Sequence, residues 1–291
     1  MALLQQIING LSLGSIYALI ALGYTMVYGI IKLINFAHGD IYMIGAFIGL
    51  YCGKNLGLSL LPTLIISMIG AALCGVIIEK VAYKPLRNSP RITLLITAIG
   101  VSLLLQNGMK LAVGSSPKAF PKLLSTEVIK LGSLSLETSK ILMLVVSIML
   151  VVFLQFIVFK TKIGKAMRAA SYDIEAASLM GINVNNIISI TFAIGSALAG
   201  AAGVLVSLAF KIVEPYMGMT PGLKAFIAAV LGGIGSIPGA LIGGLLIGLT
   251  ETLTKAYIST ILSDAIVFAI LIIILLVKPS GLLGIKINEK V

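Results

Sequence analysis

Continuous apolar segments constrain this chain more than any other feature of its sequence. A helix needs about 20 apolar residues to cross a bilayer core of roughly 30 Å. Hydrophobic residues make up 59% of the 291 positions and charged residues only 11%, which excludes the soluble globular classes. The chain is therefore expected to be an integral membrane protein. Its apolar segments, about eight in number, cover residues 7–31, 34–53, 60–78, 92–113, 141–159, 187–210, 223–250 and 258–277.

The lengths of these segments also decide between two membrane architectures. A transmembrane β-barrel has segments of about ten residues in which apolar and polar side chains alternate. The segments here are continuously apolar and much longer. We therefore expect an all-α bundle that forms a single transmembrane domain over residues 1–291.

Basic residues indicate how the bundle is oriented. The formal net charge is +11, and all three arginines lie in two polar loops. Because Lys and Arg are retained in cytoplasmic loops, we place both loops in the cytoplasm and expect a lipid bilayer, not a nucleic acid, to be the partner of this charge. The loop over residues 114–139 carries dispersed charges and is expected to be external. The two basic loops contain Lys80, Lys84, Arg87, Arg91, Lys160, Lys162, Lys165 and Arg168.

A glycine-rich stretch, VLGGIGSIPGALIGG at residues 230–244, predicts a broken or re-entrant helix. Three glycines followed by a proline interrupt backbone hydrogen bonding, which a bilayer tolerates only where protein or a water-filled cavity satisfies the freed groups. Such discontinuities are typical of transport proteins, where unwound backbone faces a pathway. The candidate pathway residues of this stretch are Gly232, Gly233, Gly235 and Pro238.

A second candidate break is the stretch INFAHGDIYM at residues 34–43, which contains the single histidine of the chain. One interpretation makes His38 and Asp40 a proton relay within the membrane. The other, which we favour, is a short polar turn at the membrane interface in which Asn35 or Asp40 caps the next helix. We include Asn35, His38 and Asp40 among the candidate residues of the pathway.

Glycines also recur at every fourth position in two segments. One series is Gly45, Gly49 and Gly53, and the other is Gly235, Gly239 and Gly243. Helices in lipid associate through close backbone packing, which small residues permit. Both series are expected to lie on helix contact faces.

The positions of the termini depend on how the breaks are interpreted. Three full crossings before the first basic loop place the N-terminus outside. Re-entrant segments at residues 34–53 and 223–236 instead place both termini inside. The sequence is compatible with both arrangements.

The longest polar stretch is KTKIGKAMRAASYDIEAASLMGIN, residues 160–183, and it predicts a short cytoplasmic helix. Apolar positions from Ile163 onward follow a three-four spacing, which indicates an amphipathic helix. Asp173 is placed to cap a helix ending near Met180, and Gly181 stands where a left-handed residue ends a helix. Such a helix either docks on a partner or lies on anionic lipid, and the pattern alone does not choose between the two.

Several stretches resemble one family of membrane transporters. EAASLMGIN, residues 175–183, is similar to the EAA loop of ABC importer permeases, which docks into a cytoplasmic ATPase. The stretches INGLSLGSIYALIALGYTMVYGIIKLINFAHGDIYMIGAF, KAFIAAVLGGIGSIPGALIGGLLIG and KPSGLLG resemble the LivH-type permeases of branched-chain amino-acid ABC importers. The resemblance spans nearly the whole chain.

The resemblance implies a subunit of an ATP-driven importer for Leu, Ile or Val in the cytoplasmic or inner membrane of a bacterium or archaeon. Its expected partners are a second homologous permease, two cytoplasmic ABC ATPases and an external substrate-binding protein. The coupling loop covers residues about 160–186, and residues 173–181 receive the ATPase stroke. The coupling residues implied by the match are Arg168, Asp173, Glu175, Ala176, Ala177 and Gly181.

The sequence has no G-x-x-x-x-G-K-[ST] motif, so we expect partner subunits to bind and hydrolyse ATP. We predict no catalytic residues, cofactor or metal ligands in this chain. The alternative function is a proton-coupled secondary transporter that uses His38 and Asp40.

Overall fold

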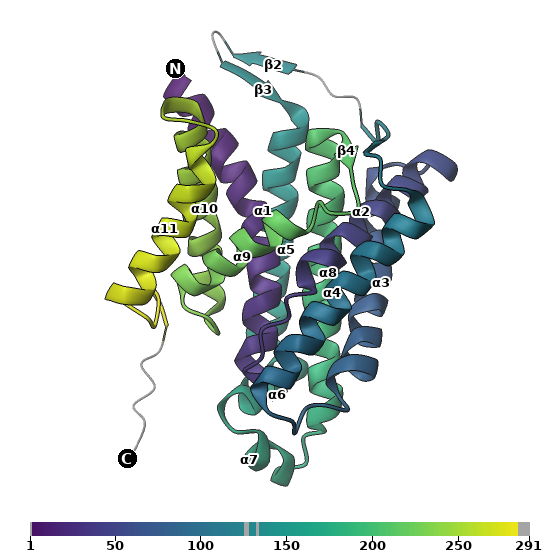
Figure 1. Ribbon diagram of the computed structural model, residues 1–291, viewed down its shortest axis with the longest axis vertical. Coiled ribbons are helices and arrows are strands. Elements are labelled where there is room, and N and C mark those ends of the chain that lie inside the picture. The colour runs from purple at the N-terminus through teal and green to yellow at the C-terminus, as the bar shows by residue number, and fades with distance from the viewer. Residues whose placement is uncertain (1, 125–127, 132–133, 285–291) are drawn as a thin grey trace.

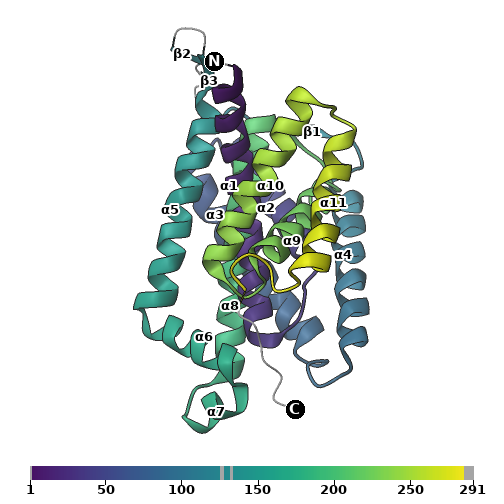
Figure 2. The ribbon, with the colours of Figure 1, turned by 90° about the vertical axis from the view of Figure 1, so that its left-hand side faces the viewer.

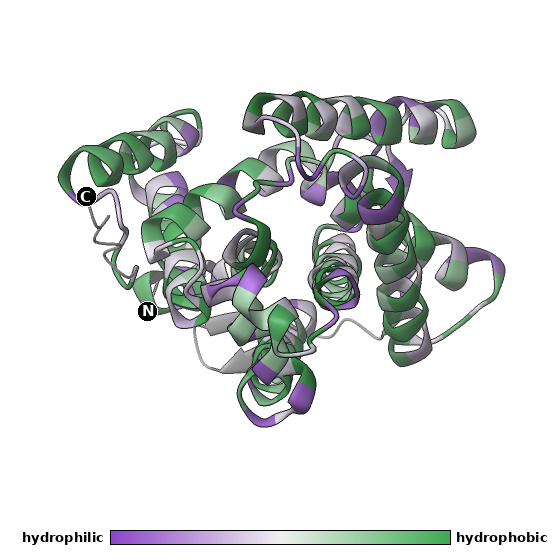
Figure 3. Ribbon diagram, turned by 90° about the horizontal axis from the view of Figure 1, so that it is seen from below, coloured by the Kyte–Doolittle hydropathy of each residue, from purple (hydrophilic) through white to green (hydrophobic). Residues whose placement is uncertain are grey.

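Long helices dominate the computed structural model, which describes residues 2–124, 128–131 and 134–284. Within these residues, six helices are long and apolar enough to cross a membrane. Seen from one end, most of the helical ribbon consists of hydrophobic residues (Figure 3). The helical elements are α1 (Ala2–Ile31), α2 (His38–Asn55), α3 (Leu60–Ile78), η1 (Glu79–Tyr83), α4 (Arg91–Val113), α5 (Thr138–Lys160), α6 (Lys162–Tyr172), α7 (Ile174–Leu179), α8 (Val184–Phe210), α9 (Met219–Gly232), α10 (Ile237–Tyr257) and α11 (Leu262–Val277).

Two groups of four helices, α1 to α4 and α8 to α11, run through the bundle in opposite directions (Figure 1). Helix α1 packs along α10, and α8 packs along α3. These two contacts are equivalent, because each joins the first helix of one group to the third helix of the other. The second helix of each group, α2 or α9, begins near the middle of the bundle and not at an end (Figure 1). This arrangement is an inverted repeat, a common architecture of membrane transporters.

The starts of α2 and α9 meet in the centre of the bundle. A Cβ atom at Gly39 would overlap the backbone at Gly218, and Gly222 also lies against Gly39. Before α2, the Asn35 side chain accepts hydrogen bonds from the N–H of Ala37, at 3.1 Å, and from the hydroxyl of Tyr83, at 2.7 Å. Glycines without side chains thus allow two helix N-termini to touch at mid-depth.

This position corrects the prediction that residues 34–43 form a turn at the membrane interface. His38 packs against Gly23 of α1, and Gly23 in turn contacts Gly195, close to the middle of α8. Asp40 does lie in the first turn of α2, as expected, but no side chain caps that helix. The polar stretch is therefore buried inside the bundle.

The two basic loops lie at the same end of the bundle, as predicted. The Arg87 guanidinium donates to the Asn185 side chain at 2.7 Å and pairs with Glu79 at 2.6 Å, which joins the loop after α3 to the start of α8. Helix α1 begins at the opposite end, beside the hairpin of β2 (Val128–Leu131) and β3 (Leu134–Glu137) (Figure 1). The arrangement with the N-terminus on the side of the basic loops is therefore wrong.

The predicted helix break lies between α9 and α10, so the segment at residues 223–250 forms two helices. Gly233 and Gly235 have φ angles of 103° and 96°, which residues with a Cβ rarely adopt. The segment at residues 278–284 satisfies the carbonyls that the break frees, because Leu282 and Leu283 donate their N–H groups to Leu231 and Gly232. Protein backbone thus provides hydrogen-bond partners at this break.

Two short sheets occur outside the long helices, in addition to the predicted all-α bundle. Strands β2 and β3 form an antiparallel pair within the loop that we placed outside. Strand β1 (Lys118–Ala119) pairs with β4 (Ile212–Val213), which follows α8. The second pair ties the external loop to the segment that leads back to the start of α9.

The glycine series confirm the predicted contact faces, except at Gly53 and Gly235. A Cβ at Gly53 would meet Pro121 and Leu123 of the external loop and not a helix. A Cβ at Gly45 would overlap the backbone of Gly200 in α8, and a Cβ at Gly243 would overlap the carbonyl of Ala228 in α9. Gly235 has open space around it and serves the backbone conformation of the break instead. Close helix contact therefore depends on Gly45 and Gly243.

We expect the substitution Gly45→Leu to separate α2 from α8 and to destabilise the protein by about 1–3 kcal/mol, the usual cost of overpacking. The measurement is thermal unfolding in detergent, followed by circular dichroism. Gly100→Leu is the matched control, because no atom lies within 4 Å of a Cβ at Gly100. Equal unfolding temperatures for the two variants would contradict the packing assigned to Gly45.

Candidate functional site

The polar stretch between α5 and α8 folds into two short helices with side-chain caps. The Thr161 hydroxyl accepts from the N–H of Gly164 at the start of α6, and Asp173 Oδ1 accepts from the N–H of Ala176, at 2.9 Å, at the start of α7. Gly181 follows α7 with a φ of 83°. The cap at Asp173 and the left-handed residue at Gly181 are confirmed.

Helix α7 projects from the end of the bundle that carries the basic loops (Figure 2). Only Ala177 of this helix is buried. Glu175 and Ala176 are exposed, and the apolar side chains of Leu179 and Met180 are 89% and 83% exposed. A rigid, capped helix with apolar side chains at its tip is the kind of surface that a protein partner covers.

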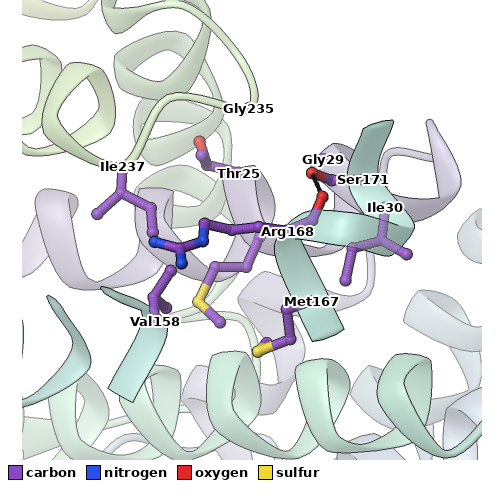
Figure 4. A pocket seen from close by; sticks show the side chains of 10 residues that line it. Thr25, Gly29, Ile30, Val158, Met167, Arg168, Ser171, Gly235 and Ile237 are labelled. Atoms are coloured by element: carbon purple, nitrogen blue, oxygen red, sulfur yellow. Dashed lines mark hydrogen bonds between the residues drawn. The ribbon is translucent and has the colours of Figure 1, made fainter. Parts of the chain in front are cut away.

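Arg168 of α6 faces a small cavity beneath the bundle (Figure 4). The cavity has a volume of about 70 Å³, and its lining includes Thr25 of α1 and Gly235 of the α9–α10 break. The Arg168 guanidinium also lies over the Phe159 ring, 5.2 Å from its centroid, which holds α6 against the end of α5. Arg168 and Gly235, which were predicted to belong to different sites, therefore border one cavity.

A larger cavity, of about 420 Å³, lies where α2 and α9 begin, and we call it the central cavity. Asp40 borders it and accepts a hydrogen bond at Oδ1 from Gln106 of α4, at 2.9 Å. The Asp40 side chain is only 2% exposed. The complete lining consists of Tyr24, Phe36, Gly39, Asp40, Leu95, Ile99, Ser102, Leu103, Gln106, Gly218, Met219, Gly222 and Leu223.

His38 is not among the residues that border this cavity. Its ring packs edge-on against Tyr24, with ring centroids 4.9 Å apart, and its Nε2 atom is buried without a hydrogen-bond partner. In the described part of the chain, the side-chain hydrogen bond of Asp40 goes to Gln106 and none links Asp40 to His38. This geometry does not provide the His38 and Asp40 pair that a direct relay requires.

The remaining pathway candidates are packed against protein. A Cβ at Gly232 would overlap Gly239, and one at Gly233 would overlap the segment at Gly284. Pro238 stands in the first turn of α10, where its missing N–H has no helical partner. Asn35, Gly232, Gly233 and Pro238 border neither of the two cavities described above, whereas Asp40 and Gly235 do.

A buried ionic cluster joins α1, α9, α10 and α11, and the sequence analysis missed its lysine. Lys224 Nζ lies 2.7 Å from both Glu251 and Asp264, and Tyr17 donates to Glu251 at 2.7 Å. Glu251 is only 2% exposed. An isolated lysine in the apolar run LKAFIAAVL is the signal that points to this cluster.

Gln106 and Ser102 of the central cavity were also not predicted. Both are polar residues in a mostly apolar helix, a pattern that is common in membrane helices that pack on one another. Their connection with Asp40 appears only when α4 is placed beside α2. No signal in the sequence identifies that pairing.

Three comparisons with known proteins bear on these sites. Residues 6–275 match the family model described as "Branched-chain amino acid transport system / permease component". The chain is 44% identical to the high-affinity branched-chain amino acid transport system permease protein BraD of Pseudomonas aeruginosa, over 99% of this chain and 98% of that protein. It is 46% identical to the LivH permease protein of Salmonella typhimurium, over 99% and 97% of the two chains.

A solved structure has a similar fold. PsaBC from Streptococcus pneumoniae in complex with Fab aligns with a TM-score of 0.52 and 14% identity, over 96% of this chain and 93% of that chain. This likeness concerns the fold alone. The family match and the identities over nearly the full chain establish that this multi-pass membrane protein belongs to the branched-chain amino acid transport system permease family.

Proposed function

We propose that this chain is one membrane subunit of an ATP-driven importer for leucine, isoleucine or valine. It forms half of the translocation pathway together with a second homologous permease. Two cytoplasmic ABC ATPases bind and hydrolyse ATP, and an external binding protein delivers the substrate. The family and the branched-chain amino acid permeases to which the chain is similar support this proposal.

The exposed tip of α7 is the observation that carries the coupling part of the proposal. Leu179 and Met180 project at the end of the bundle where basic residues indicate the cytoplasm. Caps at both ends of α7 make it rigid enough to transmit a displacement. An ATPase that covers this tip would move α7 as a unit, and residues 173–181 would receive its stroke.

A continuous set of contacts leads from α7 to the centre of the bundle. Helix α6 follows directly from α5 and places Arg168 at the cavity that Thr25 of α1 also borders. The neighbouring residue on α1, Tyr24, borders the central cavity. Displacement of α6 would therefore act on the part of α1 that separates the two cavities, which is how we propose the pathway alternates between outward and inward opening.

The first prediction concerns the energy source. In liposomes that contain the complete complex, uptake of labelled leucine should require ATP and the ATPase subunits, and it should persist when a protonophore removes the proton gradient. Uptake that follows the proton gradient without ATP would contradict the proposed importer and favour the proton-coupled alternative.

The second prediction concerns docking of the ATPase. Leu179→Ser should weaken ATPase binding by about tenfold or more, because a buried leucine contributes roughly 1.5–3 kcal/mol. Co-purification of the ATPase with the permease measures this effect. Leu111→Ser on α4 is the matched control, since Leu111 is also 89% exposed but lies in a membrane helix. Equal ATPase recovery with the two variants would show that α7 does not dock through Leu179.

The third prediction concerns coupling through Gly181. Gly181→Leu forces a side chain into a left-handed conformation, at a cost of about 1–2 kcal/mol, and should tilt α7 relative to α8. We expect ATP hydrolysis to continue while leucine uptake per ATP falls severalfold. Gly57→Leu is the matched control, because Gly57 also has a positive φ and open space around it but lies at the opposite end of the bundle. Leucine uptake per ATP should stay normal in this variant. An equal loss in both variants would assign the effect to general strain.

A further inference from the structure

We propose that the central cavity binds the transported amino acid and that the Asp40 carboxylate accepts hydrogen bonds from its ammonium group. This inference rests on the proposed function, because it locates the substrate of that importer within this subunit. It is carried by three observations: an uncompensated carboxylate, a polar setting that holds its orientation, and an apolar wall beside it.

The Asp40 carboxylate lacks a cationic partner in the described part of the chain. It is 2% exposed at mid-depth in the bundle, where an unpaired charge is costly. Lys224, on the other central half-helix, lies close to both Glu251 and Asp264 and is therefore balanced within the protein. Lys224 thus has partners of opposite charge among the described residues and Asp40 has none there, which indicates that a cationic ligand pairs with Asp40.

The surroundings of Asp40 hold its carboxylate without occupying it fully. Gln106 donates one hydrogen bond to Oδ1, and Ser102 lies one turn earlier on α4, close to the same carboxylate. A carboxylate has about four acceptor sites, so these neighbours leave capacity for the N–H groups of an ammonium ion.

An apolar wall stands beside this polar point. Phe36, Leu95, Ile99, Leu103 and Leu223 line the central cavity together with Asp40. Its volume of about 420 Å³ is in the range of small-molecule sites, which combine apolar walls with a few polar groups that orient the ligand. A branched aliphatic side chain would contact the wall while the ammonium group meets Asp40. The first turn of α9 borders the same cavity, and the positive end of its dipole would favour the carboxylate of a bound amino acid.

The test measures equilibrium binding of tritiated leucine to the purified complete complex in nanodiscs, without the binding protein. Asp40→Asn is the decisive variant, because its amide oxygen still accepts from Gln106 while the charge is lost. Loss of a charge-assisted hydrogen bond should weaken leucine binding by about tenfold to 100-fold. Two competitors separate the interactions: isoamylamine keeps the ammonium group of leucine, and isocaproate keeps the carboxylate.

We expect Asp40→Asn to weaken the binding of isoamylamine by the same factor as the binding of leucine. The binding of isocaproate should stay unchanged. Asp40→Glu should restore part of the affinity for both ammonium ligands. Unchanged leucine binding in Asp40→Asn, or equal losses for both competitors, would overturn the assignment. Absence of leucine binding to the wild-type complex would overturn it as well.

A second variant tests the apolar wall. Ile99→Trp should fill part of the central cavity and lower leucine binding about tenfold, whereas Ile96→Trp, on the exposed side of α4, should leave it unchanged. If a lipid chain fills the cavity instead, both variants will bind leucine like wild type, and the proposal fails. ATP-driven uptake by the wild-type complex is measured in parallel, so that failure of this inference is distinguished from failure of the importer function.

Discussion

The requirement that every backbone polar group be satisfied inside the membrane governs this structure. Two helices begin at mid-depth, and each leaves N–H groups without helical partners at a place that lipid would not tolerate. The turns before the two helices satisfy some of these groups, because the N–H of Asp40 donates to Ala37 and that of Met219 donates to Tyr216. The two starts lie together, with Gly39 against Gly218 and Gly222. The long helices α1, α3, α8 and α10 enclose the junction, so the irregular backbone meets protein and a cavity instead of hydrocarbon.

The inverted repeat gives this junction its functional meaning. Helix α1 passes beside the central cavity at Tyr24 and beside the small cavity of about 70 Å³ at Thr25, and Arg168 of α6 borders that small cavity as well. Under the proposed function, consecutive residues on one helix would connect the end that receives the ATPase stroke with the centre of the pathway. The ionic cluster around Lys224 fixes α9 against α10 and α11, which leaves α4 as the less constrained wall of the central cavity.

Local chemistry made part of this architecture predictable. Hydropathy located the membrane segments, the glycines and proline located the break before α10, and Asp173 and Gly181 marked the ends of α7. The predictions that failed were those that depend on tertiary contacts. Residues 34–43 were placed at the interface because a polar turn and a buried helix start have the same composition. The pairing of Asp40 with Gln106 joins positions 66 residues apart, and the partner of Lys224, Glu251, lies on another helix.

The central claim is that an aqueous pathway reaches the junction of α2 and α9. The most direct measurement is labelling of single cysteines on α4 by a membrane-impermeant thiol reagent. Native Cys52 and Cys74 are first replaced by alanine. Ser102→Cys should be labelled in the complete complex in nanodiscs because it borders the central cavity. Leu104→Cys should remain unlabelled although Leu104 is 70% exposed, because lipid covers it. Labelling of Leu104→Cys with Ser102→Cys protected would contradict the account.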